Sequence, residues 1–321
     1  MKTSSSKKTA TKPKVLAIVG PNAVGKSDLA VQLAHKFNGE IISADSRQVY
    51  RGLDLSSGKV PGKWRIRGFN RHYEYQDIPH HLVDIVSPRK SFTVQQYKKK
   101  AKRALDDIVQ RGKLPIVAGG TGFYVDSLVY DFQIPEAPPN RQLRKELEEM
   151  TTEQLMHRLS ALDPQRAKNI DVNNRRRIIR AIEIVVSIHS PVPKIDLIEN
   201  NESPYDLLKI GICLPNEELK RKIKNRLERR IKDGMIEEVR RTHFLGVSWK
   251  RLQDMGFEFH HIIQHLKGEI SREEMVALIE TKDNQFARRQ MTWFRKDKNV
   301  IWIDAPAKAS PLVEGFLSRE V

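Results

Sequence analysis

Short, nearly continuous apolar runs alternate along the chain with segments whose apolar residues recur every third or fourth position. Such runs are typical of strands buried on both faces, and their alternation with helical segments is typical of a parallel sheet. The runs are VLAIVG at 15–20, EIISAD at 40–45, HLVDIV at 81–86 and LPIVAGG at 114–120. We therefore predict a doubly wound α/β core in which helices cover both faces of a mostly parallel sheet.

Helical periodicity is clear in several segments between and after these runs. Thr93 and Gln96 fit a capping box, and apolar residues follow at helical spacing as far as Ile108. In the rest of the core, two highly charged helices are predicted at 217–232 and 271–295. Two strands are predicted at 207–214 and 300–304.

Two proline-bearing stretches divide the chain. IPEAPPN at 134–140 reads as a connector, segments with helical period follow to about Ile188, and SPVPK at 190–194 closes them. This organisation predicts a helical insertion in the α/β core. The expected divisions are a disordered basic tail at 1–13, a first part of the core at 14–133, the insertion at 134–200 and a second part of the core at 201–321.

The composition favours a polyanionic partner. The formal net charge is +17, and such a field attracts RNA, DNA or acidic membranes at long range. The one cysteine, Cys213, excludes an internal disulfide and a cysteine-based zinc finger. No stretch approaches the roughly 20 apolar residues of a membrane span, and the first residues lack a signal-peptide centre. We therefore expect a cytoplasmic protein, as a monomer and without a membrane partner.

The sequence GPNAVGKS at 20–27 fits the phosphate-loop pattern G-x-x-x-x-G-K-[ST], directly between a predicted strand and a predicted helix. Glycines let the backbone turn so that amide groups converge on phosphate oxygens at a helix N-terminus. The lysine adds a positive charge, and the serine hydroxyl suits Mg²⁺. The expected diphosphate-binding residues are Gly20, Asn22, Ala23, Val24, Gly25, Lys26 and Ser27. Kinases, ATPases and transferases with a diphosphate leaving group all remain compatible with this loop.

Two further polar groups follow predicted strands. Asp45 comes just after the second strand, and Thr121 comes after the strand that ends at AGG. Parallel strands gather functional groups at their carboxyl ends, so both side chains are candidates for the same crevice as Lys26. By itself, Asp45 fits a helix cap better than a catalytic group, whereas for Thr121 a cap of the glycine turn and a functional contact fit equally well. His80 and His81 favour a structural role over a metal site, because neighbouring residues of a strand point to opposite faces.

Five motifs occur in an order that resembles the tRNA dimethylallyltransferases, also called tRNA isopentenyltransferases. They are GPNAVGKSDLA, ADSRQVYRGLD, IPHHLVDI, VAGGTGFYVDSL and FARRQMTWFR. The resemblance implies a P-loop core with a helical insertion, and dimethylallyl diphosphate rather than ATP in the loop. It implies transfer of the dimethylallyl group to N6 of adenosine 37 in the tRNA anticodon loop. Asp45 is then the base for the amino group, while Lys26 and a Mg²⁺ ion held by Ser27 stabilise the leaving diphosphate, and Thr121 contacts substrate.

The resemblance also turns several side chains into candidates for tRNA contact. The arginines of the segment 173–186 and of its neighbourhood suit a phosphate backbone, although a solvated helix face explains them equally well without the family. Arg288 and Arg289 are candidates for contact with either diphosphate or RNA. The tRNA-contact candidates are Asp45, Ser46, Arg47, Gln48, Thr121, Arg144, Arg176, Arg177, Arg180 and Gln253.

Three other functions share some of these features. A transferase that prenylates free AMP, ADP or ATP would need the same loop and Asp45, but it would not require an arginine-bearing insertion or a net charge of +17. A small-molecule kinase explains the loop and leaves the other four motifs unexplained. A nucleic-acid-binding switch that only senses nucleotide would not depend on Asp45.

Overall fold

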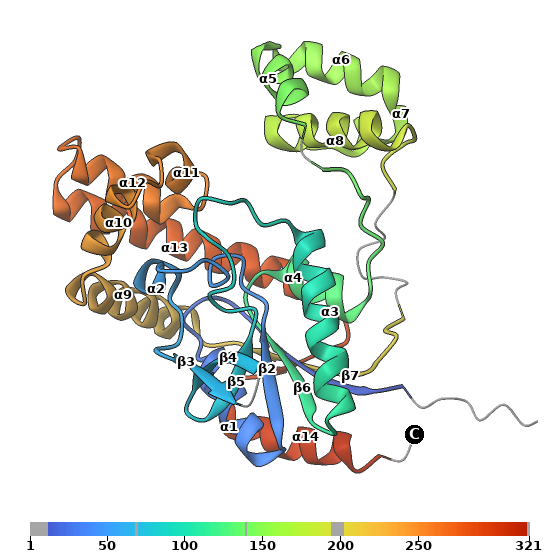
Figure 1. Ribbon diagram of the computed structural model, residues 1–321, viewed down its shortest axis with the longest axis vertical. Coiled ribbons are helices and arrows are strands. Elements are labelled where there is room, and N and C mark those ends of the chain that lie inside the picture. Colours follow the sequence, from blue (N-terminus) through green and yellow to red (C-terminus); the bar gives the residue numbers. More distant parts are fainter. Residues whose placement is uncertain (1–11, 68–69, 139, 194–201, 320–321) are drawn as a thin grey trace, which may run out of the picture. The chain divides into compact units, whose positions relative to one another are not determined.

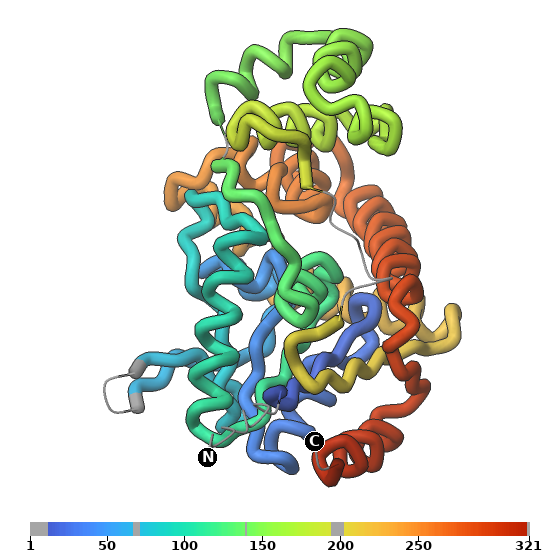
Figure 2. The backbone as a smooth tube through the Cα atoms, turned by 90° about the vertical axis from the view of Figure 1, so that its right-hand side faces the viewer, coloured from blue at the N-terminus to red at the C-terminus, as the bar shows by residue number. Residues whose placement is uncertain are grey.

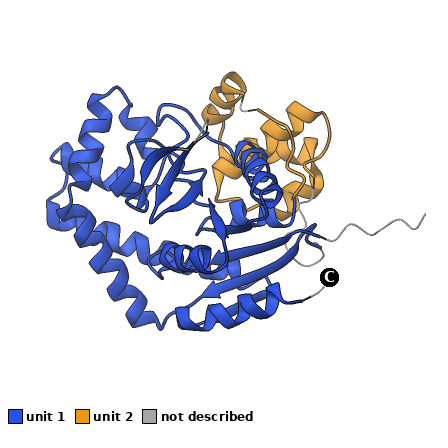
Figure 3. Ribbon diagram, turned by 60° about the horizontal axis from the view of Figure 1, so that its bottom comes forward, with its two compact units in different colours: residues 1–131, 201–321 blue, residues 132–200 orange. Residues whose placement is uncertain are grey.

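The computed structural model describes residues 12–67, 70–138, 140–193 and 202–319. The basic tail predicted at 1–13 lies almost wholly outside these residues. The described residues divide into two compact units, one within the ranges 12–131 and 202–319 and one within the range 132–193 (Figure 3). No helix among the described residues combines the length and the apolar character that a membrane crossing needs.

One sheet organises the larger unit (Figure 1). Its strand order is β3-β4-β5-β2-β6-β1-β7-β8, and every pair is parallel except β3 with β4 and β4 with β5. This result confirms the predicted mostly parallel α/β core. The strands are β1 (Lys14–Val19), β2 (Gly39–Ser43), β3 (Lys63–Arg67), β4 (Asn70–Tyr75), β5 (Ile78–His81), β6 (Leu114–Ala118), β7 (Asp206–Ile212) and β8 (Val300–Ile303).

The helices of the larger unit include the three long ones that the sequence predicts. The capping box of Thr93 with Gln96 is formed, and a second one joins Ser271 to Glu274. The helices are α1 (Lys26–Lys36), α2 (Asp54–Ser57), α3 (Val94–Gln110), α4 (Gly122–Val129), α9 (Asn216–Lys232), α10 (Met235–Phe244), α11 (Trp249–Gln253), α12 (Phe257–Leu266), α13 (Arg272–Phe294) and α14 (Ala309–Leu317), with a 3₁₀ turn at Pro306–Lys308.

The two layers of helices follow from the handedness of the crossovers. The chain moves from β1 to β2 through α1, and it later returns from β5 to β6 through α3. Right-handed connections that run in opposite directions along a sheet place their helices on opposite faces. Apolar residues of α1 and α14 pack with strand residues in one core cluster, including Leu16 and Ile210.

The sequence prediction was wrong at one strand. The apolar run 81–86 is not extended, because β5 ends at His81 and both Leu82 and Asp84 have positive φ. Only Val86 pairs again, in an isolated bridge with Tyr50. The hairpin of β3 and β4 was not predicted from the sequence. It extends the sheet edge and projects from the larger unit in Figure 2.

The smaller unit is a helical module with its own core. Its helices are α5 (Arg141–Glu149), α6 (Thr152–Leu162), α7 (Pro164–Asn169) and α8 (Arg175–Ile188). Leucines of α5 and α6 pack against isoleucines of α8 in a separate cluster. The helical periods predicted between the two proline-bearing stretches are therefore confirmed.

A buried ionic cluster joins the last strands to α4 and α13. The amine of Lys209 on β7 donates to Asp126 at 2.5 Å and to Asp297 at 2.8 Å, and its side chain is 1% exposed. The Trp293 indole donates to the second oxygen of Asp126 at 2.6 Å, and the Tyr130 hydroxyl donates to Asp297 at 2.6 Å. Burial raises the pKa of Asp126, although the neighbouring lysine opposes that shift.

Replacement of Lys209 by Met tests how much this cluster contributes to the stability of the fold. The substitution leaves two buried carboxylates without their cation, which costs about 3–5 kcal/mol in comparable cases. We expect the free energy of unfolding in urea to fall by that amount. Lys308→Met, which removes the cation of an exposed pair with Asp304, is the matched control and should leave stability unchanged. Equal stability of the two variants would contradict the structural role of Lys209.

Candidate active site

The phosphate loop connects β1 to α1 as the sequence predicts. Gly20 has φ of 140°, and a Cβ there would lie 2.6 Å from the carbonyl oxygen of Ile212. Gly25 has φ of 93° and precedes the first residue of α1. Glycine at both positions therefore allows the tight turn and its close packing on β7. The turn brings the first amides of α1 toward the cavity described below.

Lys26 carries the charge of this loop. Its amine donates to the carbonyl of Pro21 at 2.5 Å. The pKa of Lys26 is lowered to about 7, because burial and the nearby cation of Arg226 lower it more than Asp45 raises it. A bound anion would reverse the balance and favour the ammonium form.

The carboxylate of Asp45 is held by its own turn. One oxygen, Oδ1, accepts from the amide of Arg47 at 2.8 Å and from the amide of Gln48 at 3.4 Å. Gln48 in turn links the end of β2 to the cavity rim, because its side chain meets the Ser43 hydroxyl at 3.0 Å and donates to the Gly58 carbonyl at 3.3 Å. Backbone amides thus orient the Asp45 carboxylate on the rigid end of a strand.

Thr121 connects the turn of Asp45, which follows β2, to the loop that follows β6. Thr121 is the N-cap residue of α4, yet its side chain makes no capping hydrogen bond. Its Oγ1 instead accepts from the amide of Ser46 at 3.1 Å, and its own amide donates to the carbonyl of Ala44 at 3.2 Å. The side chain therefore does not cap α4, and its contact with substrate stays a prediction.

One cavity of about 790 Å³ contains all of these groups. The expectation that Lys26 and Asp45 open onto the same pocket is confirmed, and Thr121 lines it too. Among the predicted diphosphate-binding residues, Gly20 and Val24 do not line the cavity, and Val24 packs in the core. The remaining ones do: Asn22, Ala23, Gly25, Lys26 and Ser27.

Helix α9 supplies cavity residues that the sequence analysis missed. Lys222, Arg226 and Arg229 line the cavity, and their spacing of four and three residues places them on one helix face. Arg226 also donates to the Gly58 carbonyl at 3.4 Å. The spacing was visible in the sequence, but nothing in it told which highly charged helix face would meet the phosphate loop.

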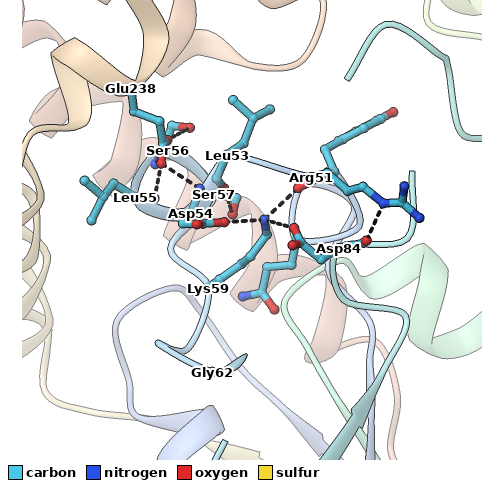
Figure 4. A network of polar contacts seen from close by, with 12 residues as sticks. Arg51, Leu53, Asp54, Leu55, Ser56, Ser57, Lys59, Gly62, Asp84 and Glu238 are labelled. Atoms are coloured by element: carbon cyan, nitrogen blue, oxygen red, sulfur yellow. Dashed lines mark hydrogen bonds and ion pairs between the residues drawn. The ribbon is translucent and has the colours of Figure 1, made fainter. Parts of the chain in front are cut away.

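A polar network fixes the cavity wall formed by α2 (Figure 4). Glu238 accepts from three consecutive amides at the start of α2, at 2.7–2.8 Å. The amine of Lys59 donates to the Tyr50 carbonyl at 2.6 Å and pairs with Asp54 and Asp84. The wall therefore depends on side chains from α10 and from the segment after β5.

The predicted RNA contacts are distributed over separate places. Ser46, Arg47 and Gln48 line the cavity. Gln253 lies half-buried on α11 and does not line the cavity. Arg288 and Arg289 are exposed on α13 and do not line it either.

In the smaller unit, the predicted arginines fall into two groups. Arg144 donates to the buried carboxylate of Glu183 at 2.6 Å, and Arg180 lies 3.5 Å from the same carboxylate. Arg180 also donates to the Ala137 carbonyl at 2.7 Å. Arg176 and Arg177 are exposed on α8.

Comparison with known proteins places this cavity in a family context. The IPP transferase family model matches residues 48–297. The chain belongs to the IPP transferase family. The resemblance drawn from the five motifs is thereby confirmed.

The curated relatives in this family are similar over almost their whole length. The tRNA dimethylallyltransferase of Anoxybacillus flavithermus is 36% identical over 91% of this chain and 90% of its own length. The tRNA dimethylallyltransferase 1 of Geotalea daltonii is 38% identical over 95% of each chain.

Solved structures of similar proteins share the fold of this chain. The tRNA isopentenylpyrophosphate transferase of Bacillus halodurans is 32% identical, covers 95% of this chain and 97% of its own, and has a TM-score of 0.67. A eukaryotic dimethylallyltransferase acting on tRNA has a TM-score of 0.76 at 24% identity, over 96% of this chain and 81% of its own, which shows the shared fold.

The lowered pKa of Lys26 predicts proton uptake on anion binding. With a pKa of about 7, the amine is mostly neutral at pH 8 and becomes an ammonium when an anion binds. We expect methyl diphosphate to bind with uptake of up to one proton at pH 8 and far less at pH 6, and to bind more weakly as the pH rises from 7 to 9. Titration calorimetry in buffers of different ionisation heat measures the uptake.

Lys26→Arg is the control for this titration, because a guanidinium stays charged over the whole range. That variant should show no uptake from this position. Identical proton uptake by the variant and the wild-type protein would assign the titration to another group.

Proposed function

We propose that this IPP transferase transfers the dimethylallyl group of dimethylallyl diphosphate to N6 of adenosine 37 in the anticodon loop of tRNA, and releases diphosphate. The observation that carries the proposal is the single cavity that contains both Lys26 and Asp45. One group suits the anion that leaves, and the other suits the proton that the amine must lose. The names of the relatives support tRNA as the acceptor.

The diphosphate half of the cavity is cationic. Diphosphate oxygens would accept from the amides of the phosphate loop, from Lys26 and from Arg226 of α9. As the bond from C1 of the prenyl group to oxygen breaks, its electron pair goes to the diphosphate. Cations placed around that oxygen stabilise the growing charge.

The acceptor half is arranged around Asp45. The N6 amino group of adenine forms the new bond to C1 and must lose one proton. The Asp45 carboxylate takes that proton, and the amides of Arg47 and Gln48 fix its direction. Because the amino group cannot reach Asp45 from within a stacked anticodon loop, the base must turn out of the stack into the cavity.

The residues of the loop fit a magnesium ion. Ser27, whose side chain carries a hydroxyl, lines the cavity at the first turn of α1. Mg²⁺ takes oxygen ligands, and it commonly uses few protein ligands when phosphates and water supply the others. When bound there, it would supply positive charge to the diphosphate oxygens.

Free adenine nucleotides are the alternative acceptors. They would use the same Lys26 and Asp45, so the cavity alone does not separate the two reactions. The exposed Arg176 and Arg177 of the insertion and the net charge of +17 favour an extended polyanion. We propose that the insertion contacts tRNA through these exposed arginines.

Asp45→Asn tests the proposed chemistry. The amide keeps the shape of the side chain but does not accept the proton, so we expect kcat for dimethylallyl transfer to tRNA to fall at least about 100-fold. The affinity for tRNA should stay within about twofold. The assay follows labelled dimethylallyl diphosphate into tRNA. Asp106→Asn, on the exposed face of α3, is the control and should retain full activity.

The same assay with AMP separates the rival reaction. Label in tRNA and not in AMP supports the proposal. Label in AMP but not in tRNA would establish an adenylate isopentenyltransferase instead. Retention of full transfer to tRNA by Asp45→Asn would refute the role of this carboxylate.

A further inference from the structure

The Arg47 side chain contacts residues of both α12 and α13. Its guanidinium pairs with the buried carboxylate of Glu258, and the side chain is 19% exposed. It also lies over the ring of Phe257 at 5.1 Å and over the ring of Phe286 at 5.7 Å. A Cβ on Gly256 would lie 2.7 Å from this guanidinium, so the absence of a side chain there makes room for it. The start of α12 and the middle of α13 therefore form a closely fitting seat for Arg47.

The backbone of the same residue holds the proposed base. The Arg47 amide donates to Oδ1 of Asp45 at 2.8 Å, the shorter of the two backbone hydrogen bonds to that oxygen. The contacts of the Arg47 side chain restrain the backbone that carries this amide. The orientation of the carboxylate is thus linked to contacts made by α12 and α13.

Helix α13 also holds the other two loops of the cavity. Asp283 accepts from the side-chain amide of Asn22 at 3.1 Å, and Gln290 accepts from the backbone amide of Asn22 at 2.8 Å. Gln290 donates to the Gly120 carbonyl at 2.8 Å, next to Thr121. Asp283, Phe286 and Gln290 follow at spacings of three and four, so one face of α13 contacts all three loops.

Arg47 lies among charges of both signs. Arg47 and Arg230 face Glu258 and Asp283, and all four line the cavity. Burial would lower the pKa of Arg47, but Glu258 and Asp45 outweigh it and raise that pKa. Burial raises the pKa of Asp283, and Glu258 adds to the effect. Because its guanidinium already pairs with Glu258, Arg47 is less available to an RNA phosphate.

We propose that Arg47 is a positioning residue for Asp45 and not an RNA contact. The seat formed by Phe257, Glu258 and Phe286 fixes the turn that follows β2, and α13 holds the phosphate loop in the same frame. The carboxylate and the diphosphate site are thereby kept at one fixed separation. This inference rests on the proposed transfer reaction, in which Asp45 accepts the proton.

Arg47→Met tests the inference, because it removes both the charge and the planar guanidinium that contacts Phe257, Glu258 and Phe286. We expect kcat at saturating tRNA to fall about 10- to 100-fold, because a small misplacement of a reacting group has an effect of that order. The dissociation constant for tRNA should change less than about twofold. Arg103→Met removes an exposed cation from α3 and serves as the control, with no change expected in either quantity.

The dependence of tRNA affinity on salt separates positioning from RNA contact. Loss of one phosphate contact makes the slope of log K against log salt shallower by about one. We expect the slope of Arg47→Met to equal that of the wild-type protein. An unchanged kcat, or a shallower slope whatever happens to kcat, would overturn the inference. Activity of the wild-type protein in the same assay shows that the proposed function stands independently.

Two conservative variants keep the test valid if Arg47→Met folds poorly. Glu258→Gln keeps the shape of the seat but removes its charge, so it should reproduce the loss of kcat with an unchanged salt slope. Arg47→Lys keeps the charge and should restore part of kcat relative to Arg47→Met. Thermal melting shows that each variant used is folded. Full kcat in folded Glu258→Gln would contradict the role of the seat.

Discussion

The register of three neighbouring strands is the constraint on which the site depends. Strand β6 lies between β2 and β1, with Ala118 paired to Ser43 on one side and to Ile18 on the other. The three strands therefore end at one level, and the loops that follow them begin side by side. Hydrogen bonds between these loops, such as that from the Ser46 amide to Thr121, complete the arrangement. A single cavity that contains both Lys26 and Asp45 is the consequence.

Much of the fold could be predicted because its signals are local. The phosphate loop, the capping boxes of α3 and α13 and the apolar central strands are each encoded by a few adjacent residues. The run 81–86 misled the prediction because buried residues of an irregular segment are as apolar as those of a strand. The hairpin of β3 and β4 was missed because charged residues such as Arg65 and Arg71 dominate it at the sheet edge.

The site was predictable only where its parts are local. Lys26 and Asp45 follow from short motifs at strand ends, whereas the contribution of α9 depends on how that helix packs across the cavity. The sequence also gave no sign that Glu183 would engage Arg144 and Arg180, or that two phenylalanines and Glu258 would enclose Arg47. An arginine in the sequence is a candidate phosphate ligand. Its partners in the folded chain decide whether its guanidinium binds a phosphate or pairs with a carboxylate of the protein.

The most direct test of the shared cavity is a crystal structure of the protein with an anticodon stem–loop and a non-reactive dimethylallyl thiodiphosphate. We expect the diphosphate on the amides of the phosphate loop beside Lys26, and the N6 atom of the flipped adenine within hydrogen-bonding distance of the Asp45 carboxylate. An adenine bound in a different cavity from the diphosphate would contradict the account.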